Sequence, residues 1–257
     1  MPKNATIVCI LVCYNRAMKP FVEIKHFKMA FNGKTVIKDL SFDVMKGEIF
    51  GLLGSNGSGK TTTIRTLLSL YTPTGGELLI NGEPFDPNKS KITIGYLPEE
   101  RGLYKKESVI DTMMYFAELK GLKNAREWCE KYLKRVGLED KLQEKTEKLS
   151  TGQQQKVQLG ICMMNDPELL ILDEPTKGFD PVNRKLLMQI IEELHEKGST
   201  IILITHYMDE VERLCDRAVL LKDGVAHAYG TISEIKKKFG NKSLDEIFVN
   251  IYGGENE

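Results

Sequence analysis

The sequence predicts an α/β fold with a helical segment inserted into it, and three observations support this. Short apolar strands alternate with helical stretches along most of the 257 residues, as in domains that pack helices against a largely parallel sheet. Between about residues 107 and 165 the alternation stops, and apolar residues recur at the three- and four-residue spacing of helices. Two strands end at residues typical of ligand sites, and in α/β folds ligands bind at the carboxyl ends of strands.

The order of the elements follows from apolar spacing and from the residues that flank each run. Alternating or continuous apolar runs predict strands at 21–31, 35–44, 48–54, 76–82, 92–98, 168–174, 199–206 and 217–224. Amphipathic spacing predicts helices at 60–70, 183–198 and 208–215, besides those of the insertion. A basic run at 234–242 is expected to be a solvated helix face.

The composition excludes several classes of protein. The chain carries 36 Lys and Arg and 36 Asp and Glu, so its formal net charge is zero. This balance argues against a dedicated nucleic-acid-binding protein, and we expect no nucleic-acid partner. The five cysteines are scattered and form no Cys-x-x-Cys pair. Such a set is expected of a reduced, cytosolic protein rather than of a disulfide or zinc framework.

The first residues of the chain are expected to lie outside the domain. The apolar run Thr6 to Tyr14 is far shorter than the roughly 20 residues of a spanning helix, so no segment is expected to cross a membrane. Met18 follows that run, which makes residues 1–17 a candidate N-terminal extension upstream of the true start. The domain is then 18–257. A function at a membrane would require a partner that supplies the crossing.

The segment GSNGSGKTT, here called the phosphate loop, has the composition of a phosphate-binding turn between a strand and a helix. Glycines let backbone N–H groups converge on one centre, and the helix N-terminus adds partial positive charge. Lys60 is expected to reach the β- and γ-phosphates, and the Thr61 hydroxyl to bind Mg²⁺. The residues expected to surround the nucleotide phosphates are Gly54, Ser55, Asn56, Gly57, Ser58, Gly59, Lys60, Thr61 and Thr62.

Two further strands end in side chains suited to hydrolysis. The run LLILDEP ends in Asp173, a candidate Mg²⁺ ligand through water, and Glu174, a candidate general base for an attacking water. The run STIILITH ends in His206, which could contact a γ-phosphate or hold the water together with Glu174. Parallel neighbours would bring the three residues and the phosphate loop to one edge of the sheet.

The segment LSTGQQQKVQLG, residues 149–160, needs a separate explanation. A glycine and three consecutive glutamines open a helix, although glycine is a poor helix former and three adjacent side chains cannot all face one core. Taken alone, the segment is best interpreted as a polar N-cap followed by a solvated first turn.

Together these residues resemble the ATP-binding cassette (ABC) ATPases over about residues 21–230. LSTGQ, here called the signature segment, is similar to the family's Leu-Ser-Gly-Gly-Gln, and the Asp-Glu strand, the TKGFD loop and His206 follow in the family's order. The resemblance implies a P-loop NTPase core with a RecA-like mixed sheet, an antiparallel β subdomain and an inserted helical subdomain at about 107–165. It implies ATP and Mg²⁺ as cofactors.

The resemblance also implies that two cassettes pair head to tail, most simply as a homodimer. The signature segment, through Ser150, Gly152 and Gln153, would then bind the γ-phosphate held by the other protomer. Asp180 is similar to the loop aspartate that couples the two sites. Thr151 and Phe179 stand where the family usually has Gly and Leu.

The resemblance assigns roles less directly to an aromatic residue near adenine and to Glu99. Phe31 is similar to the aromatic that stacks on adenine, with Phe27 as the alternative, and either could instead be a core aromatic. Glu99 stands where the family usually has Gln. A carboxylate there can still accept from a water on Mg²⁺, but it adds negative charge near the phosphates, so a plain surface role stays open.

The leading hypothesis is the ATP-hydrolysing subunit of an ABC transporter. The segment GYLPEERGLY is similar to the sodium- and drug-efflux exporters, in which the ATPase and the membrane permease are separate chains. The protein would then lie at the cytoplasmic face of the cell membrane and contact the permease through residues 99–104 and the helical insertion. The alternative is a soluble ABC ATPase, such as the iron–sulfur assembly type. A non-catalytic cassette is disfavoured because Glu174 and His206 are both present.

Overall fold

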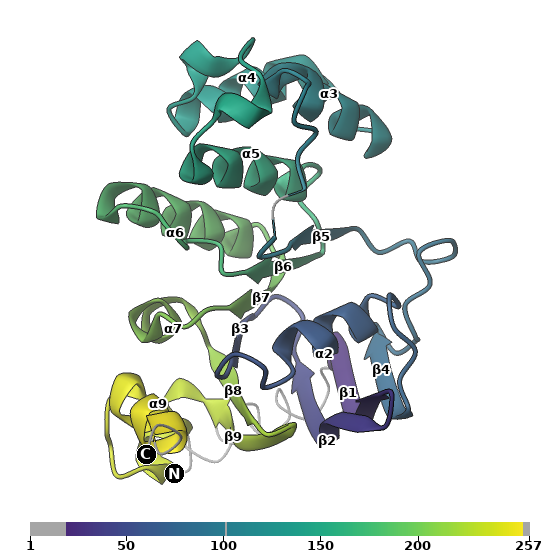
Figure 1. Cartoon of the computed structure of the whole chain (residues 1–257), viewed down its shortest axis with the longest axis vertical. Coiled ribbons are helices and arrows are strands. Elements are labelled where there is room, and N and C mark those ends of the chain that lie inside the picture. Colours follow the sequence, from purple (N-terminus) through teal and green to yellow (C-terminus); the bar gives the residue numbers. More distant parts are fainter. Residues whose placement is uncertain (1–18, 101, 254–257) are drawn as a thin grey trace, which may run out of the picture.

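A single mixed sheet organises the molecule (Figure 1). The computed structural model describes residues 19–100 and 102–253. The nine described strands are β1 (Val22–Phe31), β2 (Lys34–Val44), β3 (Ile49–Leu53), β4 (Gly75–Ile80), β5 (Ile94–Leu97), β6 (Leu169–Asp173), β7 (Thr200–Ile204), β8 (Arg217–Lys222) and β9 (Val225–Thr231). Their order across the sheet is β4-β1-β2-β9-β8-β3-β7-β6-β5.

The parallel half of the sheet is its buried centre. β8, β3, β7, β6 and β5 pair in parallel in that order. β3, β6 and β7 are buried at every position. A strand covered on both faces must be apolar throughout, which explains the continuous apolar runs in the sequence.

The other half of the sheet is antiparallel except where β2 pairs in parallel with β9, and it curls around the helix that follows the phosphate loop. β1 pairs with β2 and with β4 in antiparallel fashion. This helix is α2 (Lys60–Leu67), and its Ile64 shares a buried cluster with Phe27 of β1 and Phe50 of β3. Figure 1 shows α2 lying against the antiparallel strands. The predicted mixed sheet with an antiparallel part is therefore confirmed.

The inserted helices form a layer of their own at one end of the molecule (Figure 1). They are α3 (Val109–Leu119), α4 (Ala125–Arg135) and α5 (Thr151–Met163), with short 3₁₀ turns η1 (Glu139–Lys141) and η2 (Thr146–Lys148) between the last two. α3 packs on both α4 and α5, and α5 also packs on β5. The insertion is thus helical, as predicted, and α5 connects it to the sheet.

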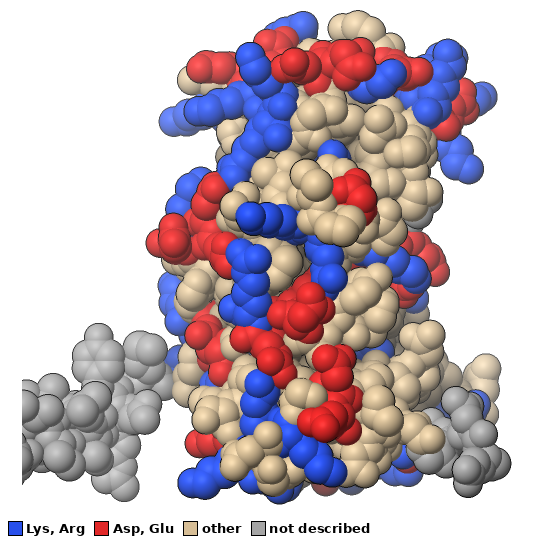
Figure 2. Space-filling view, turned by 90° about the vertical axis from the view of Figure 1, so that its left-hand side faces the viewer, with Lys and Arg blue, Asp and Glu red and all other residues tan. Residues whose placement is uncertain are grey.

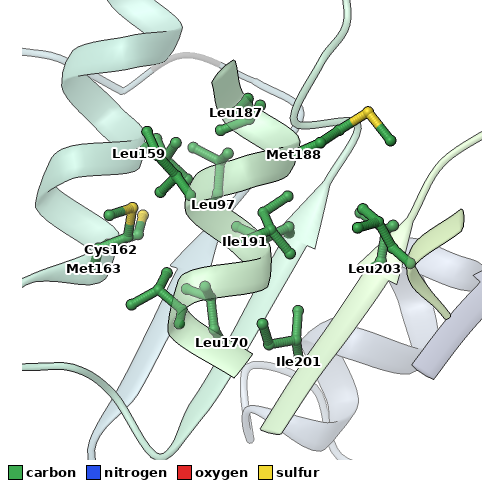
Figure 3. Close-up of a cluster of buried hydrophobic side chains, with 14 of the residues drawn as sticks. Leu97, Leu159, Cys162, Met163, Leu170, Leu187, Met188, Ile191, Ile201 and Leu203 are labelled. Carbon is green, nitrogen blue, oxygen red and sulfur yellow. The ribbon is translucent and has the colours of Figure 1, made fainter. Parts of the chain in front are cut away.

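Helices α5 and α6 (Pro181–Glu196) cover the face of β5, β6 and β7 that Figure 3 shows. The cluster between them contains Leu159, Cys162, Met163, Leu187, Met188, Ile191, Leu97, Leu170, Ile201 and Leu203. Interiors are close-packed, so truncating one of these side chains, such as Ile191→Ala, would cost about 2–5 kcal/mol. This packing sets the position of the loops that leave β6 and β7.

Helix α2 is shorter than the sequence predicts, because it ends at Leu67 rather than at residue 70. Ser69 has φ +58°, a left-handed conformation that terminates a helix of L-residues. The amide of Ser69 bonds to Thr66 O and that of Leu70 to Arg65 O, at 2.9 and 2.8 Å. These two hydrogen bonds form a Schellman motif, which satisfies the last carbonyls of α2.

The C-terminal elements were largely missed by the sequence prediction. After α7 (Met208–Leu214) and β8 come β9, α8 (Ile232–Lys238) and α9 (Leu244–Tyr252). Both helices begin with a capping box, Thr231 with Glu234 and Ser243 with Glu246, and that Ser/Thr-x-x-Glu pattern could have predicted them. The basic run 234–242 begins within α8 and is mostly exposed, as expected of a solvated helix face, although residues 239–242 lie beyond the end of the helix.

The surface charges and the cysteines of the described residues add little to the fold. Basic and acidic side chains are interspersed on the face seen in Figure 2, in keeping with their equal numbers. Within residues 19–100 and 102–253, no helix combines the length and the apolar character that a membrane crossing needs. Cys129, Cys162 and Cys215 are buried free thiols. The predicted extension 1–17 lies outside the described residues.

Candidate functional site

One pocket of about 660 Å³ gathers most of the predicted site residues at the carboxyl ends of the parallel strands. The predicted residues that line it are Gly54, Ser55, Asn56, Gly57, Gly59, Lys60, Thr61, Thr62, Glu99, Asp173, Glu174 and His206. Three more lining residues, Val36, Lys177 and Phe248, were not predicted. The pocket therefore joins six segments that are separated in the sequence.

The phosphate loop has backbone conformations that require glycine. Gly57 and Gly59 have φ values of +80° and +107°, and a Cβ on Gly59 would collide with Ile37 of β2. Gly59 occupies the N-cap of α2, and no side chain caps that helix. The first amides of α2 are thus not satisfied by a side chain and are directed toward an anion site. Ser58 is buried and does not line the pocket.

Lys60 is held at the pocket by backbone carbonyls. Its Nζ donates to Gly54 O at 2.8 Å and to Ser55 O at 2.9 Å. Burial lowers the pKa of Lys60, and nearby Asp173 and Glu174 oppose that shift. Hydrogen bonds between charged partners are about twice as strong as neutral ones. Phosphate oxygens would therefore be better partners for this ammonium than the two carbonyls.

Asp173 is a buried carboxylate that lacks a full set of partners. It is 3 % exposed, and its Oδ2 accepts no hydrogen bond. Burial, and then repulsion by Glu99 and Glu174, raises its pKa to about 6. A divalent cation would relieve both effects, and the oxygen donors of Asp173, Glu99 and Thr61 are of the kind that Mg²⁺ prefers.

The described residues contain no group of three or more His, Cys, Asp or Glu side chains able to hold a metal by themselves. Mg²⁺ usually takes only one or two carboxylates from the protein and its other ligands from phosphates and water. The donor set beside the phosphate loop therefore fits Mg²⁺ bound together with a nucleotide.

Glu174 and His206 form a pair at the ends of two neighbouring strands. His206 Nδ1 lies 2.8 Å from Glu174 Oε2. Burial raises the pKa of Glu174, while the close approach of His206 lowers it. The backbone of Glu174 has φ +51°, and its amide donates to Ile204 O at 2.8 Å. A non-glycine residue in this conformation is strained and persists only where its surroundings hold it.

Lys177 adds a second cation to the pocket. Its Nζ lies 2.6 Å from Glu99 Oε1, and both side chains are about half exposed. The hydrogen bond and the charge of Glu99 raise the pKa of Lys177. This contact neutralises the carboxylate that stands at the family's usual glutamine position. A lysine in a turn after a strand has no distinctive sequence pattern, so only its position in space reveals it.

The aromatic residues proposed for adenine do not line the pocket. Phe31 is 39 % exposed and packs edge-on against Tyr71, with ring centroids 5.3 Å apart. Phe27 is completely buried among the core residues of the antiparallel strands. The alternative that Phe27 stacks on a base is therefore wrong. Val36 and Phe248 supply the apolar side chains of the pocket wall instead.

The signature segment lies outside this pocket in the single chain. Ser150 is the N-cap of α5 and forms a capping box with Gln153: Ser150 Oγ accepts from Gln153 N, and Gln153 Oε1 accepts from Ser150 N at 2.9 Å. Gln154 donates to the carbonyl oxygens of Thr146 and Leu149, both at 3.1 Å. The N-cap interpretation is thus correct as far as the local structure goes.

The third glutamine, Gln155, points inward. It is 5 % exposed, and its Nε2 donates to Glu174 O at 3.5 Å. Gly152 faces the Phe179 ring, which a Cβ would approach to 3.3 Å. Asp180 caps α6 by accepting from the amides of Val182 and Asn183, at 2.9 and 3.0 Å. Gln155 and Gly152 thus connect the start of α5 to the loop after β6.

Comparison with known proteins agrees with the geometry. Residues 37–177 match the family model described as ABC transporter. An ABC transporter ATP-binding protein of Methanocaldococcus jannaschii is 44 % identical over 86 % of this chain and 81 % of its own length. The Nod factor export ATP-binding protein I of Paraburkholderia xenovorans is 36 % identical over 88 % of this chain and 76 % of its own length.

A solved structure shares the fold. It is described as the ATP binding subunit of an ABC transporter, and it superposes with a TM-score of 0.82 at 33 % identity, covering 90 % of this chain and 98 % of that one. One pocket is surrounded by the phosphate loop, the Asp173 and Glu174 carboxylates and His206, in agreement with the sequence comparisons. The chain belongs to the ABC transporter family of ATP-binding proteins and is an ATPase.

Proposed function

We propose that this ATPase drives an exporter and works with a separate membrane-spanning permease subunit. The observation that carries the proposal is the placement of Lys60, Glu174 and His206 around one pocket, which supplies the groups that ATP hydrolysis needs. Export is supported by the similarity to a relative named for Nod factor export. The protein would lie at the cytoplasmic face of the cell membrane, bound to its permease.

In the proposed reaction, Glu174 orients an attacking water and accepts its proton. Its carboxylate suits this role because burial raises its pKa above that of an exposed glutamate, which makes it a stronger base. His206 fixes the carboxylate through the 2.8 Å contact. Lys60 exchanges its carbonyl partners for phosphate oxygens. Asp173, Thr61 and Glu99 would hold Mg²⁺, which neutralises charge on the phosphates when bound.

Two copies of the chain would pair head to tail to complete the site. The support is that Ser150, Gly152 and Gln153 lie at a helix N-terminus outside the pocket, where a second protomer could meet them. In a homodimer, a second copy of this chain would supply the other cassette. Asp180, at the start of α6, would connect the two sites.

The catalytic assignment is tested with Glu174→Gln, which keeps the shape of the side chain and removes the base. Hydrolysis, measured as phosphate release, should fall by on the order of 10²-fold or more, while ATP binding persists and an ATP-bound dimer appears on gel filtration. Glu192→Gln is the control, because Glu192 pairs with Arg213 on the surface. Normal turnover in Glu174→Gln would contradict the assignment.

The permease is tested separately. When this chain is produced together with the product of a neighbouring open reading frame that encodes several apolar spans of about 20 residues, the two should co-purify from detergent-solubilised membranes. Recovery of this chain without any membrane protein under the same conditions would favour the soluble alternative.

A further inference from the structure

The buried carboxylate of Glu210 connects two loops that leave the sheet at the pocket. Glu210 lies in α7 and is 1 % exposed. Its Oε1 accepts from Thr176 Oγ1 at 2.5 Å, and its Oε2 accepts from Thr205 Oγ1 at 3.0 Å. Thr176 is two residues after Glu174, and Thr205 immediately precedes His206. One side chain thus contacts the loop of each proposed catalytic residue.

Arg184 of α6 completes this network. Its Nε donates to Glu210 Oε1 at 2.6 Å, and its Nη2 donates to Asp209 Oδ1, also at 2.6 Å. The guanidinium carbon lies 4.4 Å from the centroid of the Tyr207 ring. That ring is 4.2 Å from the ring of His206. The arginine therefore holds Glu210 on one side and the neighbour of His206 on the other.

Stability alone is a poor explanation for the Glu210 carboxylate, which is buried while Arg184 stays partly exposed. Removing a charge from water costs so much that well-packed apolar residues are often at least as stable in the place of an ion pair. A satisfied polar network instead fixes one geometry, because each donor and acceptor has a defined direction. The strained conformation of Glu174, with φ +51°, needs such fixed surroundings.

We propose that Glu210 is a positioning residue for ATP hydrolysis. Through Thr176 and Thr205 it holds the loops of Glu174 and His206 at the separation that keeps their 2.8 Å contact, and Arg184 keeps the Glu210 carboxylate in place. This inference rests on the proposed catalytic roles of Glu174 and His206. Small displacements of catalytic groups can reduce turnover by on the order of 10²-fold.

The test is Glu210→Gln, which keeps the shape of the side chain and removes its charge. Because Glu210 does not line the pocket, the kcat for ATP should fall by on the order of 10-fold or more while the Kd for ATP changes less than about twofold. Glu212→Gln is the matched control: it lies on the same helix, accepts from Leu244 N and pairs with Lys236. The control should keep the wild-type kcat.

A mutant cycle shows whether Glu210 acts through Glu174. In a Glu174→Gln chain, single-turnover hydrolysis should be hardly changed by adding Glu210→Gln, because the group it positions is already lost. The proposal would be overturned if the two substitutions reduced the rate of hydrolysis by factors that multiply in the double mutant, or if Glu210→Gln kept the wild-type kcat. If Glu210→Gln does not fold, Thr205→Val decides: a reduced kcat with unchanged Kd supports the proposal, and a wild-type kcat overturns it. Normal turnover in Glu174→Gln would instead identify a failure of the proposed function.

Discussion

Lys177 Nζ lies 2.6 Å from Glu99 Oε1, and this ion pair joins the loop after β6 to the loop after β5 at the nucleotide pocket. The family usually has a neutral glutamine at the position of Glu99. The lysine therefore compensates for a charge that would otherwise repel the phosphates and Asp173, whose pKa Glu99 already raises.

Removing the lysine should expose this repulsion. Lys177→Ala should raise the KM for ATP by up to about fivefold, because exposed ion pairs contribute about 0.2–1 kcal/mol. Glu99→Gln should keep hydrolysis and should restore the KM in the Lys177→Ala chain. Lys197→Ala is the control, since Lys197 forms an equally exposed pair with Asp166 at 3.0 Å. An unchanged KM in Lys177→Ala would show that the pair has no role in binding.

Asp173 should lower the stability of the nucleotide-free protein at neutral pH. Its pKa of about 6 lies above the ordinary value of 3.8, so the folded state resists ionisation. The penalty is absent below about pH 4, develops as the pH rises from the ordinary pKa to the folded pKa, and approaches about 3 kcal/mol by roughly pH 7. Asp173→Asn should therefore stabilise the protein more at pH 8 than at pH 5 while impairing hydrolysis.

Urea unfolding at the two pH values measures this effect. Asp86→Asn is the control of opposite sign, because the backbone hydrogen bond from Asn88 lowers the pKa of Asp86. It should not stabilise the protein at either pH. Equal stabilisation of Asp173→Asn at pH 5 and pH 8 would show that charge burial is not its cause.

Phe248 of α9 should contribute to nucleotide binding. It lines the pocket, and its ring packs against that of Tyr252 at an interplanar angle of 39°, with centroids 4.3 Å apart. Phe248→Ala removes an apolar wall and should raise the KM for ATP several-fold, since a buried aromatic contact contributes about 1 kcal/mol. Phe248→Leu keeps an apolar side chain there and should raise the KM less. Val249→Ala, on the exposed side of α9, is the control. A lower melting temperature with an unchanged KM would make Phe248 purely structural.

The signature segment should act on the other protomer. Lys60→Ala impairs the phosphate loop, and Ser150→Arg blocks the signature segment by its bulk. In a mixed dimer both defects fall on one composite site, and the other site is intact. The purified heterodimer, made from differently tagged chains, should trap nucleotide at one site, and each homodimer should trap little. Equal trapping in all three dimers would argue that the segment serves only as the cap of α5.

Much of the site could be predicted because it depends on local backbone rules. Positive φ at Gly57 and Gly59 and a strand followed by carboxylates are properties of short segments, and these patterns are visible without the fold. Phe31 shows the limit of such reasoning. Its place at the end of β1 follows from the chain, but its contact with Tyr71 depends on how another loop packs against it.

The sequence by itself determined the α/β class, the helical insertion, the phosphate loop and the residues at the ends of β6 and β7, because these arise from apolar periodicity and from turn chemistry within a few residues. Only the tertiary structure decided that Lys177 meets Glu99, that Gln155 reaches Glu174, that α9 brings Phe248 to the pocket and that Glu210 joins two loops. Apart from the Glu210–Thr205 hydrogen bond, which spans five positions, these contacts connect residues separated by 19 to about 200 positions, and no local pattern encodes such a proximity in space.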